Sequence, residues 1–327
     1  MRRMTVPALP SFVEPCGHDI YAVDTGFHRP RFDAAYLVLH GGRAAIVDAG
    51  TNHAVPRILE ALAALGLARD AVDWVIPTHV HLDHAGGVGL LVQELPAARV
   101  MAHPRAARHL VDPSQLWAGA TAVYGEAEMR RNYGTLVPVP AERVDTSRDG
   151  LQLSLAGRTL EFADTPGHAR HHHCLWDEAS AGWFTGDTFG LSYREFDTAR
   201  GAWLLPTSTP VQFDPEAMRV SVERLLARSP RSMFLTHYGR VGDVPRLGAL
   251  LLALLDEMVA LGRRVAALGD ARHAALCEGL NTIYRRSLAE HGCTLAPEPL
   301  RQLLELDVEL NAQGMAVWLD RESAGQP

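Results

Sequence analysis

The apolar and polar positions of the first hundred residues follow two different periods. Residues 36–47 form two short apolar runs around a His-Gly-Gly turn, which is typical of a β-hairpin. Apolar side chains at helical spacing predict a helix at 55–65. A short apolar strand at 74–76 runs into His79, and helical spacing returns at 88–95. The predicted order is therefore hairpin, helix, strand, polar loop and helix.

The middle of the chain mixes short strands with amphipathic helices. Alternation with period two predicts a hairpin of residues 151–155 and 158–162. Asp214 ahead of Pro215 is a typical helix start, because the side chain caps the first turn and proline fits the first helical position. The remaining expected elements are helices at 114–131 and 215–228 and strands at 174–176, 183–185 and 232–236.

From residue 245 onward the pattern is helical throughout, with expected helices at 245–267, 270–290 and 297–320. The change near Gly242 predicts three parts: an N-terminal extension at 1–17, a core domain at 18–242 and a helical C-terminal extension at 243–327. Short strands covered by amphipathic helices favour an α/β fold with two packed sheets and helices outside.

The composition narrows the range of partners. The chain has 327 residues, of which 47% are hydrophobic and 21% charged, and these shares are ordinary for a globular protein. Its formal charge of −7 argues against nucleic acid as a partner, because nucleic-acid binding needs a basic face. The chain contains no lysine, so no lysine can act as a base, a Schiff-base former or a phosphate ligand.

The cysteines and the apolar runs indicate a cytoplasmic protein. The cysteines are scattered without a CxxC pair, which is typical of a reducing compartment: Cys16, Cys174, Cys277 and Cys293. The basic start is not followed by the apolar segment of a signal peptide. No apolar run approaches the 18 residues or so of a membrane span, so a membrane is not an expected partner.

The strongest local signal is the segment HVHLDH, which follows the strand at 74–76 and precedes two glycines. Its metal-competent side chains are His79, His81, Asp83 and His84. Alternate residues of extended chain share a face, so His79 and His81 can point at one ion. One ion cannot easily accept all four side chains from so short a segment, whereas two adjacent ions can.

Three more metal-competent residues end apolar segments, where loops on a rigid scaffold carry function. His168 lies in TPGH, Asp187 in FTGDT and His237 in LTHYG. Each alone is weak evidence, but together with HVHLDH they predict a metal centre.

HVHLDH resembles the HxHxDH motif of the metallo-β-lactamase superfamily, and TPGH, FTGDT, the late His237 and Asp48-Ala49-Gly50 fall in that family's order. The resemblance covers about residues 18–240. It implies the α/β metallo-β-lactamase fold, an αββα sandwich, with the C-terminal helices as an extension. It assigns seven ligands to two metal ions: His79, His81 and His168 to the first, Asp83, His84 and His237 to the second, and Asp187 to both.

The resemblance implies a metal-dependent hydrolase of a small-molecule substrate. A metal-bridging hydroxide would attack the carbonyl of an ester, thioester or lactone, and the second ion would stabilise the oxyanion. The expected catalytic residues are Asp83, as a proton shuttle, and Tyr193, as a hydrogen-bond donor near the oxyanion. Zinc is the first expectation for both ions; iron or manganese also suits ligands that offer only nitrogen and oxygen.

Two subfamilies are similar in layout. Glyoxalase II shares FTGDT and C-terminal helices, but it typically holds glutathione with basic residues that include lysine. The quinolone-signal response proteins, which act as thioesterases, share a core followed by long helices. Two other classes stay open: a mononuclear iron dioxygenase that oxidises sulfur, and a regulatory protein with a vestigial site. The apolar stripe at 247–258 could cap the site, form a homodimer through the C-terminal helices or pack on the core.

Overall fold

The computed structural model describes residues 9–208 and 211–325, apart from the side chains of Val123 and Tyr124. The chain divides into two compact units. The first unit runs to Ala163 and includes 175–184, and the second takes 164–174 and the chain from Thr185 onward. The predicted boundary at 242 lies within the second unit and stays a prediction.

The first unit contains a seven-stranded sheet whose strands follow one another in chain order. They are β1 (Val13–Gly17), β2 (Ile20–Asp24), β3 (Ala34–His40), β4 (Arg43–Val47), β5 (Val72–Ile76), β6 (Arg99–Ala102) and β7 (Val144–Thr146). Pairing is antiparallel from β1 to β4 and parallel from β4 to β7. The predicted β3–β4 hairpin is confirmed; Gly41 and Gly42 both take positive φ, as a two-residue hairpin turn requires.

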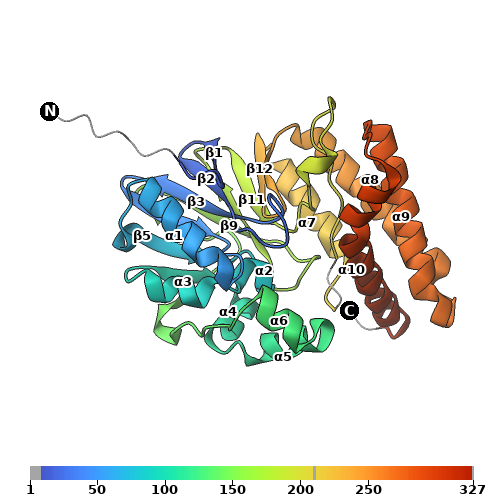
Figure 1. Ribbon diagram of the computed structural model, residues 1–327, viewed down its shortest axis with the longest axis horizontal. Coiled ribbons are helices and arrows are strands. Elements are labelled where there is room, and N and C mark those ends of the chain that lie inside the picture. The colour runs from blue at the N-terminus through green and yellow to red at the C-terminus, as the bar shows by residue number, and fades with distance from the viewer. Residues whose placement is uncertain (1–8, 209–210, 326–327) are drawn as a thin grey trace. The chain divides into compact units, whose positions relative to one another are not determined.

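Helices cover this sheet. Helices and strands together bury the apolar side chains that the sequence places at helical spacing and in short apolar strands. They are α1 (Val55–Ala64), α2 (Leu82–Ala85), α3 (Val88–Glu94), α4 (Pro104–Val111), α5 (Ser114–Tyr124) and α6 (Glu126–Asn132), with 3-10 turns η1 (Asn52–Ala54), η2 (Arg69–Ala71) and η3 (Ala141–Arg143). Figure 1 shows α1 and α3 against the sheet, where Ile58 and Leu91 join Ile46 and Val75 in one buried core. This packing makes β4 and β5 a rigid base for the loops that follow them.

The second sheet has six strands in the order β13-β12-β11-β10-β9-β8. Its strands are β8 (Gln152–Leu155), β9 (Arg158–Asp164), β10 (His173–Asp177), β11 (Gly182–Gly186), β12 (Ser232–Leu235) and β13 (Gly239–Val241). The pairings β8–β9, β10–β11 and β12–β13 are antiparallel hairpins. The β8–β9 hairpin expected from the sequence is therefore present, like the β3–β4 hairpin of the first sheet.

The second unit is mainly helical. Its helices are α7 (Pro215–Ala227), α8 (Val244–Val265), α9 (Arg272–His291) and α10 (Pro297–Ser323), with 3-10 turns η4 (Arg194–Phe196) and η5 (Gly269–Ala271). Asp214 caps α7 as predicted, because its side chain accepts a hydrogen bond from the Ala217 backbone N–H. The apolar stripe of α8 packs against α7 and α9, with Leu247, Leu251 and Met258 buried. A homodimer through these helices stays a prediction.

Several predicted boundaries were wrong. The helix expected at 114–131 is broken at Gly125, whose φ of +81° separates α5 from α6. The end of the expected polar loop is the short helix α2. Strands β1, β2, β6, β7 and β13 were not predicted, since short or partly polar strands show little alternation. Of the predicted N-terminal extension, residues 1–8 lie outside the described residues, and β1 pairs with β2.

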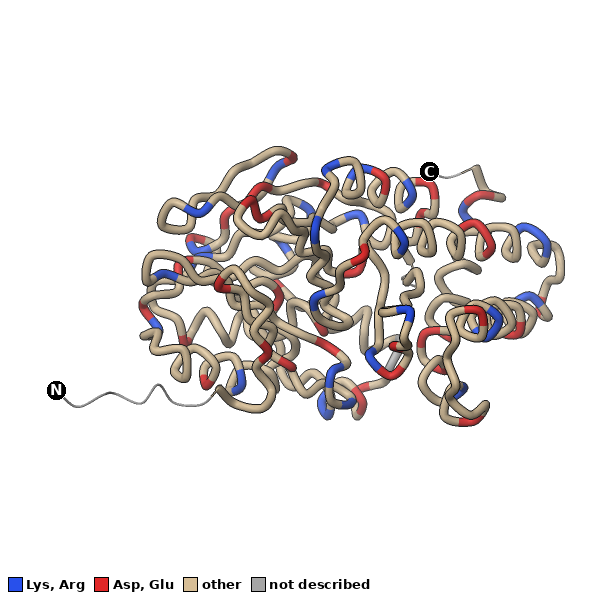
Figure 2. The backbone as a smooth tube through the Cα atoms, turned by 90° about the horizontal axis from the view of Figure 1, so that it is seen from above, with Lys and Arg blue, Asp and Glu red and all other residues tan. Residues whose placement is uncertain are grey.

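Charged residues are interspersed along the backbone of each unit (Figure 2). Many form short-range pairs on helix surfaces, such as Arg301 with Glu298 and Glu305 on α10. Such exposed pairs contribute little each. Across residues 9–208 and 211–325, no helix is both long and apolar enough to cross a membrane.

One ion pair of the first unit is fully buried. Arg158 Nε and Nη2 donate to the two carboxylate oxygens of Asp177 at 2.7 and 2.6 Å, and Nη1 donates to the carbonyls of His18 and Leu39. Burial alone would raise the pKa of Asp177, but the hydrogen bonds from Arg158 and Ser180 hold that pKa below its ordinary value. The pair thus joins β9 and β10 to the first sheet of the same unit.

We expect Arg158→Met to lower the free energy of unfolding by roughly 3–5 kcal/mol at pH 7, because it leaves a buried carboxylate uncompensated. The pKa of Asp177 is depressed in the folded chain, so the pair's contribution is present above the unfolded pKa and is lost as the pH falls. Urea unfolding between pH 7 and 3 should show the difference from the native chain shrinking with acid. Arg99→Met, which breaks the half-exposed pair with Asp145, is the control and should cost about 1 kcal/mol or less. An equal loss in both variants contradicts the prediction.

Candidate metal centre

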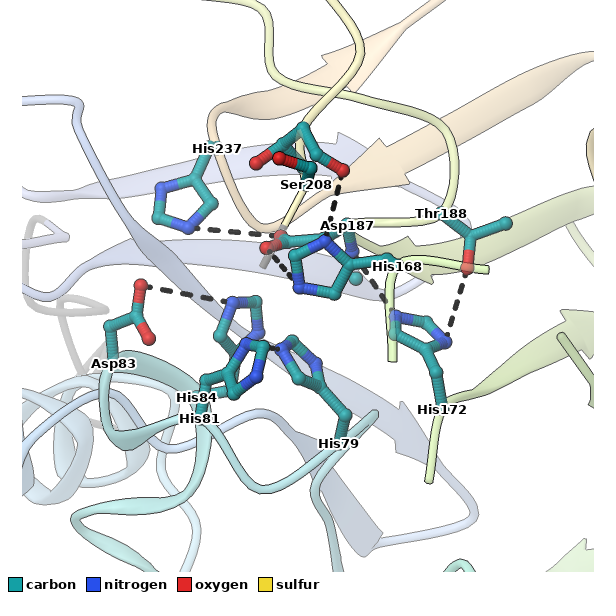
Figure 3. Close-up of polar contacts among 12 residues, drawn as sticks. His79, His81, Asp83, His84, His168, His172, Asp187, Thr188, Ser208 and His237 are labelled. Atoms are coloured by element: carbon teal, nitrogen blue, oxygen red, sulfur yellow. Dashed lines mark hydrogen bonds and ion pairs between the residues drawn. The ribbon is translucent and has the colours of Figure 1, made fainter. Parts of the chain in front are cut away.

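The HVHLDH segment begins three residues after the end of β5, and its second half forms the start of α2. His79 is fully buried, and its Nε2 lies 2.7 Å from Nδ1 of the half-buried His81. Asp83 and His84 follow on α2, with Asp83 Oδ2 3.9 Å from His84 Nε2 (Figure 3). The first unit therefore brings together the four metal-competent side chains that the motif predicted.

The two glycines after the motif allow the backbone to approach the β4–α1 connection closely. A Cβ on Gly87 would lie 2.7 Å from the carbonyl oxygens of both Ala49 and Thr51. Gly87 N–H donates to Gly50 O at 2.8 Å, and Ala49 N–H donates to His84 O at 2.8 Å. No side chain fits in this contact, so the glycine keeps α2 against the end of β4.

Asp48, which directly follows β4, contacts His84 of the motif and Thr78 just before it. Its φ of +55° is a left-handed conformation that aspartate tolerates, and it turns the carboxylate toward β5. Oδ1 accepts a hydrogen bond from Thr78 N–H at 2.7 Å, and Oδ2 lies 2.8 Å from His84 Nδ1. An ionised carboxylate can only accept, so His84 carries its proton on Nδ1 and presents Nε2 toward Asp83.

The second unit gathers the other three predicted ligands around the Asp187 carboxylate. Asp187 directly follows β11, and His237 lies two residues after β12. Asp187 Oδ2 lies 3.2 Å from His168 Nε2, and Oδ1 lies 3.7 Å from His237 Nε2 (Figure 3). All three side chains are buried. Each oxygen of one carboxylate thus faces a different imidazole, as in a carboxylate that bridges two ions.

His168 is placed by the loop TPGH, which packs directly on α7. Gly167 has a φ of +134°, and a Cβ there would lie 2.3 Å from the backbone of Met218. His168 Nδ1–H donates to the carbonyl of Thr207 at 3.1 Å, because a carbonyl can only accept. In the neutral ring Nε2 then carries the lone pair that can bind a metal ion, on the side of the ring that faces Asp187.

His172 contacts the backbone of Asp187. Its Nε2 accepts a hydrogen bond from Asp187 N–H at 3.2 Å, so the ring is neutral with its proton on Nδ1. That nitrogen lies 3.0 and 3.2 Å from the hydroxyls of Thr165 and Thr188. His172 therefore orients the loop that carries Asp187.

The donors in each unit are imidazole nitrogens and carboxylate oxygens, which suit zinc, iron and manganese. Both His84 and His168 have one nitrogen held by the protein and point the other toward a predicted ligand of the same unit. The ligand types and their hydrogen-bonded supports therefore fit divalent metal binding.

Tyr193, the predicted oxyanion donor, is buried, and its hydroxyl donates to Asp307 Oδ1 on α10 at 3.0 Å. A catalytic role for Tyr193 stays a prediction. Asp48 was noted in the sequence only as part of Asp48-Ala49-Gly50, without a function. Its position after an apolar strand was the available signal, but its contact with His84 depends on the pairing of β4 with β5.

Comparisons with known proteins identify the family of the chain. A family model described as the metallo-beta-lactamase superfamily matches residues 28–237, a range that includes every predicted ligand. A hydroxyacylglutathione hydrolase of Aeromonas hydrophila subsp. hydrophila is 30% identical over 200 residues, which are 61% of this chain and 58% of that protein. An atrochrysone carboxyl ACP thioesterase of Aspergillus fumigatus is 29% identical over 154 residues, 47% of this chain and 38% of the relative. This chain thus spans well under two thirds of both relatives.

Among solved structures, a metallo-beta-lactamase family protein from Thermus thermophilus has a TM-score of 0.64 and 22% sequence identity, with 94% of each chain covered. At this identity the likeness concerns the fold alone. It confirms the fold expected from the motifs, including two sheets, outer helices and C-terminal helices.

We expect Asp48→Ala to weaken metal binding roughly 10–100-fold, because His84 loses the partner that fixes its tautomer and ring orientation. The affinity can be measured by competition with a chromophoric chelator, with the fold checked by circular dichroism. Asp73→Ala, which removes a half-exposed carboxylate paired with Arg43 in the same sheet, is the matched control and should leave affinity unchanged. Unchanged affinity in Asp48→Ala would show that the support of His84 is unimportant.

Proposed function

Since the chain belongs to the metallo-β-lactamase superfamily, we propose that it is a hydrolase that uses two metal ions held by the seven ligands that the sequence predicts. His79, His81 and His168 would hold the first ion, and Asp83, His84 and His237 the second. Asp187 would bridge them. We propose zinc for both positions, because the donors are nitrogen and oxygen and the reaction needs no redox change.

The observation that carries this proposal is the position of the Asp187 carboxylate between two imidazoles. Its oxygens face His168 Nε2 at 3.2 Å and His237 Nε2 at 3.7 Å, in three side chains that are all buried. A buried carboxylate needs positive charge or hydrogen bonds around it. One ion beside each oxygen would satisfy that need and would assign the two histidines to different ions.

We propose that the substrate carries an ester, thioester or lactone, with a thioester preferred. Support comes from the names of two relatives, a thioesterase and a hydroxyacylglutathione hydrolase. When bound, two divalent ions would lower the pKa of a water molecule and offer positive charge to the developing oxyanion. The protein's own part is to fix the ligand nitrogens through Asp48 and the Thr207 carbonyl and to move the proton that the water gives up.

Asp83 is the proposed proton carrier. Its side chain is 24% exposed, whereas that of the adjacent His84 is fully buried. A carboxylate that reaches both a ligand position and solvent can accept a proton and pass it to a leaving group. Tyr193 is proposed as a hydrogen-bond donor to the oxyanion, which requires its hydroxyl to exchange Asp307 for the substrate.

We expect the purified chain to contain two metal ions and to hydrolyse at least one member of a panel of thioesters, lactones and simple esters. Chelation should abolish the activity, and zinc should restore it. His81→Ala should lose both metal and turnover, because it removes a ligand. Elemental analysis and a thiol-release assay on one sample provide the measurement. One iron per chain without hydrolysis would overturn the proposal and favour oxidation of sulfur instead.

Two variants separate metal binding from catalysis. With both metal positions filled by added metal, we expect Asp83→Asn to lower kcat about 10²-fold or more, because proton transfer by a placed side chain contributes roughly 10²–10⁴-fold. Tyr193→Phe should lower kcat with metal content unchanged. The measurement is steady-state kinetics on the best panel substrate at equal metal occupancy. Wild-type kcat in either fully loaded variant would remove that residue from the mechanism.

A further inference from the structure

A second set of metal-competent side chains lies between α9 and α10, two helices that pack on each other in the second unit. His273 and Cys277 are one turn apart on α9, and Glu309 comes from α10. His273 Nε2 lies 3.2 Å from Glu309 Oε2 and 3.6 Å from Cys277 Sγ, and Sγ lies 3.8 Å from the same carboxylate oxygen. Three different donor atoms therefore converge on one point.

The dimensions of this triangle match tetrahedral zinc. With bonds of about 2.0–2.1 Å to nitrogen, 2.3 Å to sulfur and 2.0–2.2 Å to oxygen, a tetrahedral ion separates its nitrogen and oxygen ligands by about 3.4 Å and sulfur from each by about 3.6 Å. The corresponding distances here are 3.2, 3.6 and 3.8 Å. Only small side-chain shifts would be needed to accept an ion.

A catalytic triad would need a different arrangement of the same three residue types. In a triad the acid and the nucleophile contact opposite nitrogens of the histidine ring. Here one nitrogen, Nε2 of His273, faces both partners. Burial and the neighbouring Glu309 also raise the pKa of the Cys277 thiol, which is the reverse of what an activated nucleophile requires.

Glu309 is already oriented for this role. Gln313, one turn further along α10, donates to Glu309 Oε1 at 2.8 Å, so the other oxygen points toward His273 and Cys277. A ligand carboxylate held through its second oxygen is the usual design of a metal site. The side chains of His273 and Glu309 are each 47% exposed, which gives an ion access from solvent.

We propose that His273, Cys277 and Glu309 bind one zinc ion or a similar thiophilic divalent ion, with the fourth position open to water. The ion would displace the thiol proton and join α9 to α10. It would differ from the proposed hydrolytic centre by its sulfur ligand and would not depend on that centre. By binding only the folded chain, it would stabilise the packing of these two helices.

Cobalt(II) added to the metal-free native chain tests this site directly. We expect a thiolate-to-cobalt charge-transfer absorption in the near ultraviolet that saturates at one ion per chain. No ligand of the proposed hydrolytic centre is a thiol, so His81→Ala should keep the absorption. Cys277→Ser should lose the absorption and one bound ion, whereas Cys293→Ser, which alters another partly exposed cysteine of the second unit, should keep both. Absence of the absorption in the native chain, or its persistence in Cys277→Ser, would overturn the proposal.

Two further measurements do not depend on the folding of Cys277→Ser. Zinc should slow the alkylation of Cys277 by iodoacetamide in the native chain and leave the rate at Cys293 unchanged, as read by peptide mass spectrometry. Gln313→Ala should weaken zinc binding at this site roughly tenfold or more, because Glu309 loses its support. Equal alkylation of Cys277 with and without zinc would contradict the assignment.

Discussion

A histidine can offer one ring nitrogen to a metal ion reliably only when the protein holds the other, and this requirement shapes both ligand sets. In the first unit, Asp48 holds Nδ1 of His84. In the second, the carbonyl of Thr207 holds Nδ1 of His168. Each of these partners lies far from its histidine in the sequence or across a loop, so the orientation of the donors depends on the tertiary fold.

The parallel pairing of β4 with β5 explains why Asp48 can contact His84, which lies 36 residues later in the chain. Val47 pairs with Ile76, so the residues that follow the two strands emerge at the same edge of the sheet. Asp48 leaves β4 in a left-handed turn, and Thr78 meets its carboxylate two residues after β5. A shift of this register by one residue would turn these side chains to opposite faces. The buried core under β4 and β5 therefore determines ligand geometry as well as stability.

The sequence was most informative where the necessary residues are close together in the chain. HVHLDH carries four metal-competent side chains within six residues, and TPGH and FTGDT each place a predicted ligand directly after a glycine, so all three could be recognised without a structure. The role of Asp48 could not be read, because it depends on the register of two strands. The site at His273 and Cys277 shows only a four-residue spacing, and Glu309 joins it through the packing of α9 on α10. The strands that escaped prediction are too short for alternation to be distinctive.

The helix α10 has buried polar residues on a face that an isolated amphipathic helix would make apolar. Asp307 accepts from the Tyr193 hydroxyl, and Asn311 accepts from Ser208 N–H while its amide donates to Pro206 O and the hydroxyl of Tyr284. Buried polar groups are costly unless they are paired, so these contacts favour one position of α10 over its alternatives.

The segment that α10 holds begins just after Asp187. Leu191 and Leu205 close it with a β-bridge, and Tyr193 within it and Ser208 just beyond it form hydrogen bonds with α10. An apolar interface would tolerate sliding of the helix, whereas paired polar groups penalise it, because each displaced group would be left buried without its partner. α10 therefore helps to position the segment that follows Asp187.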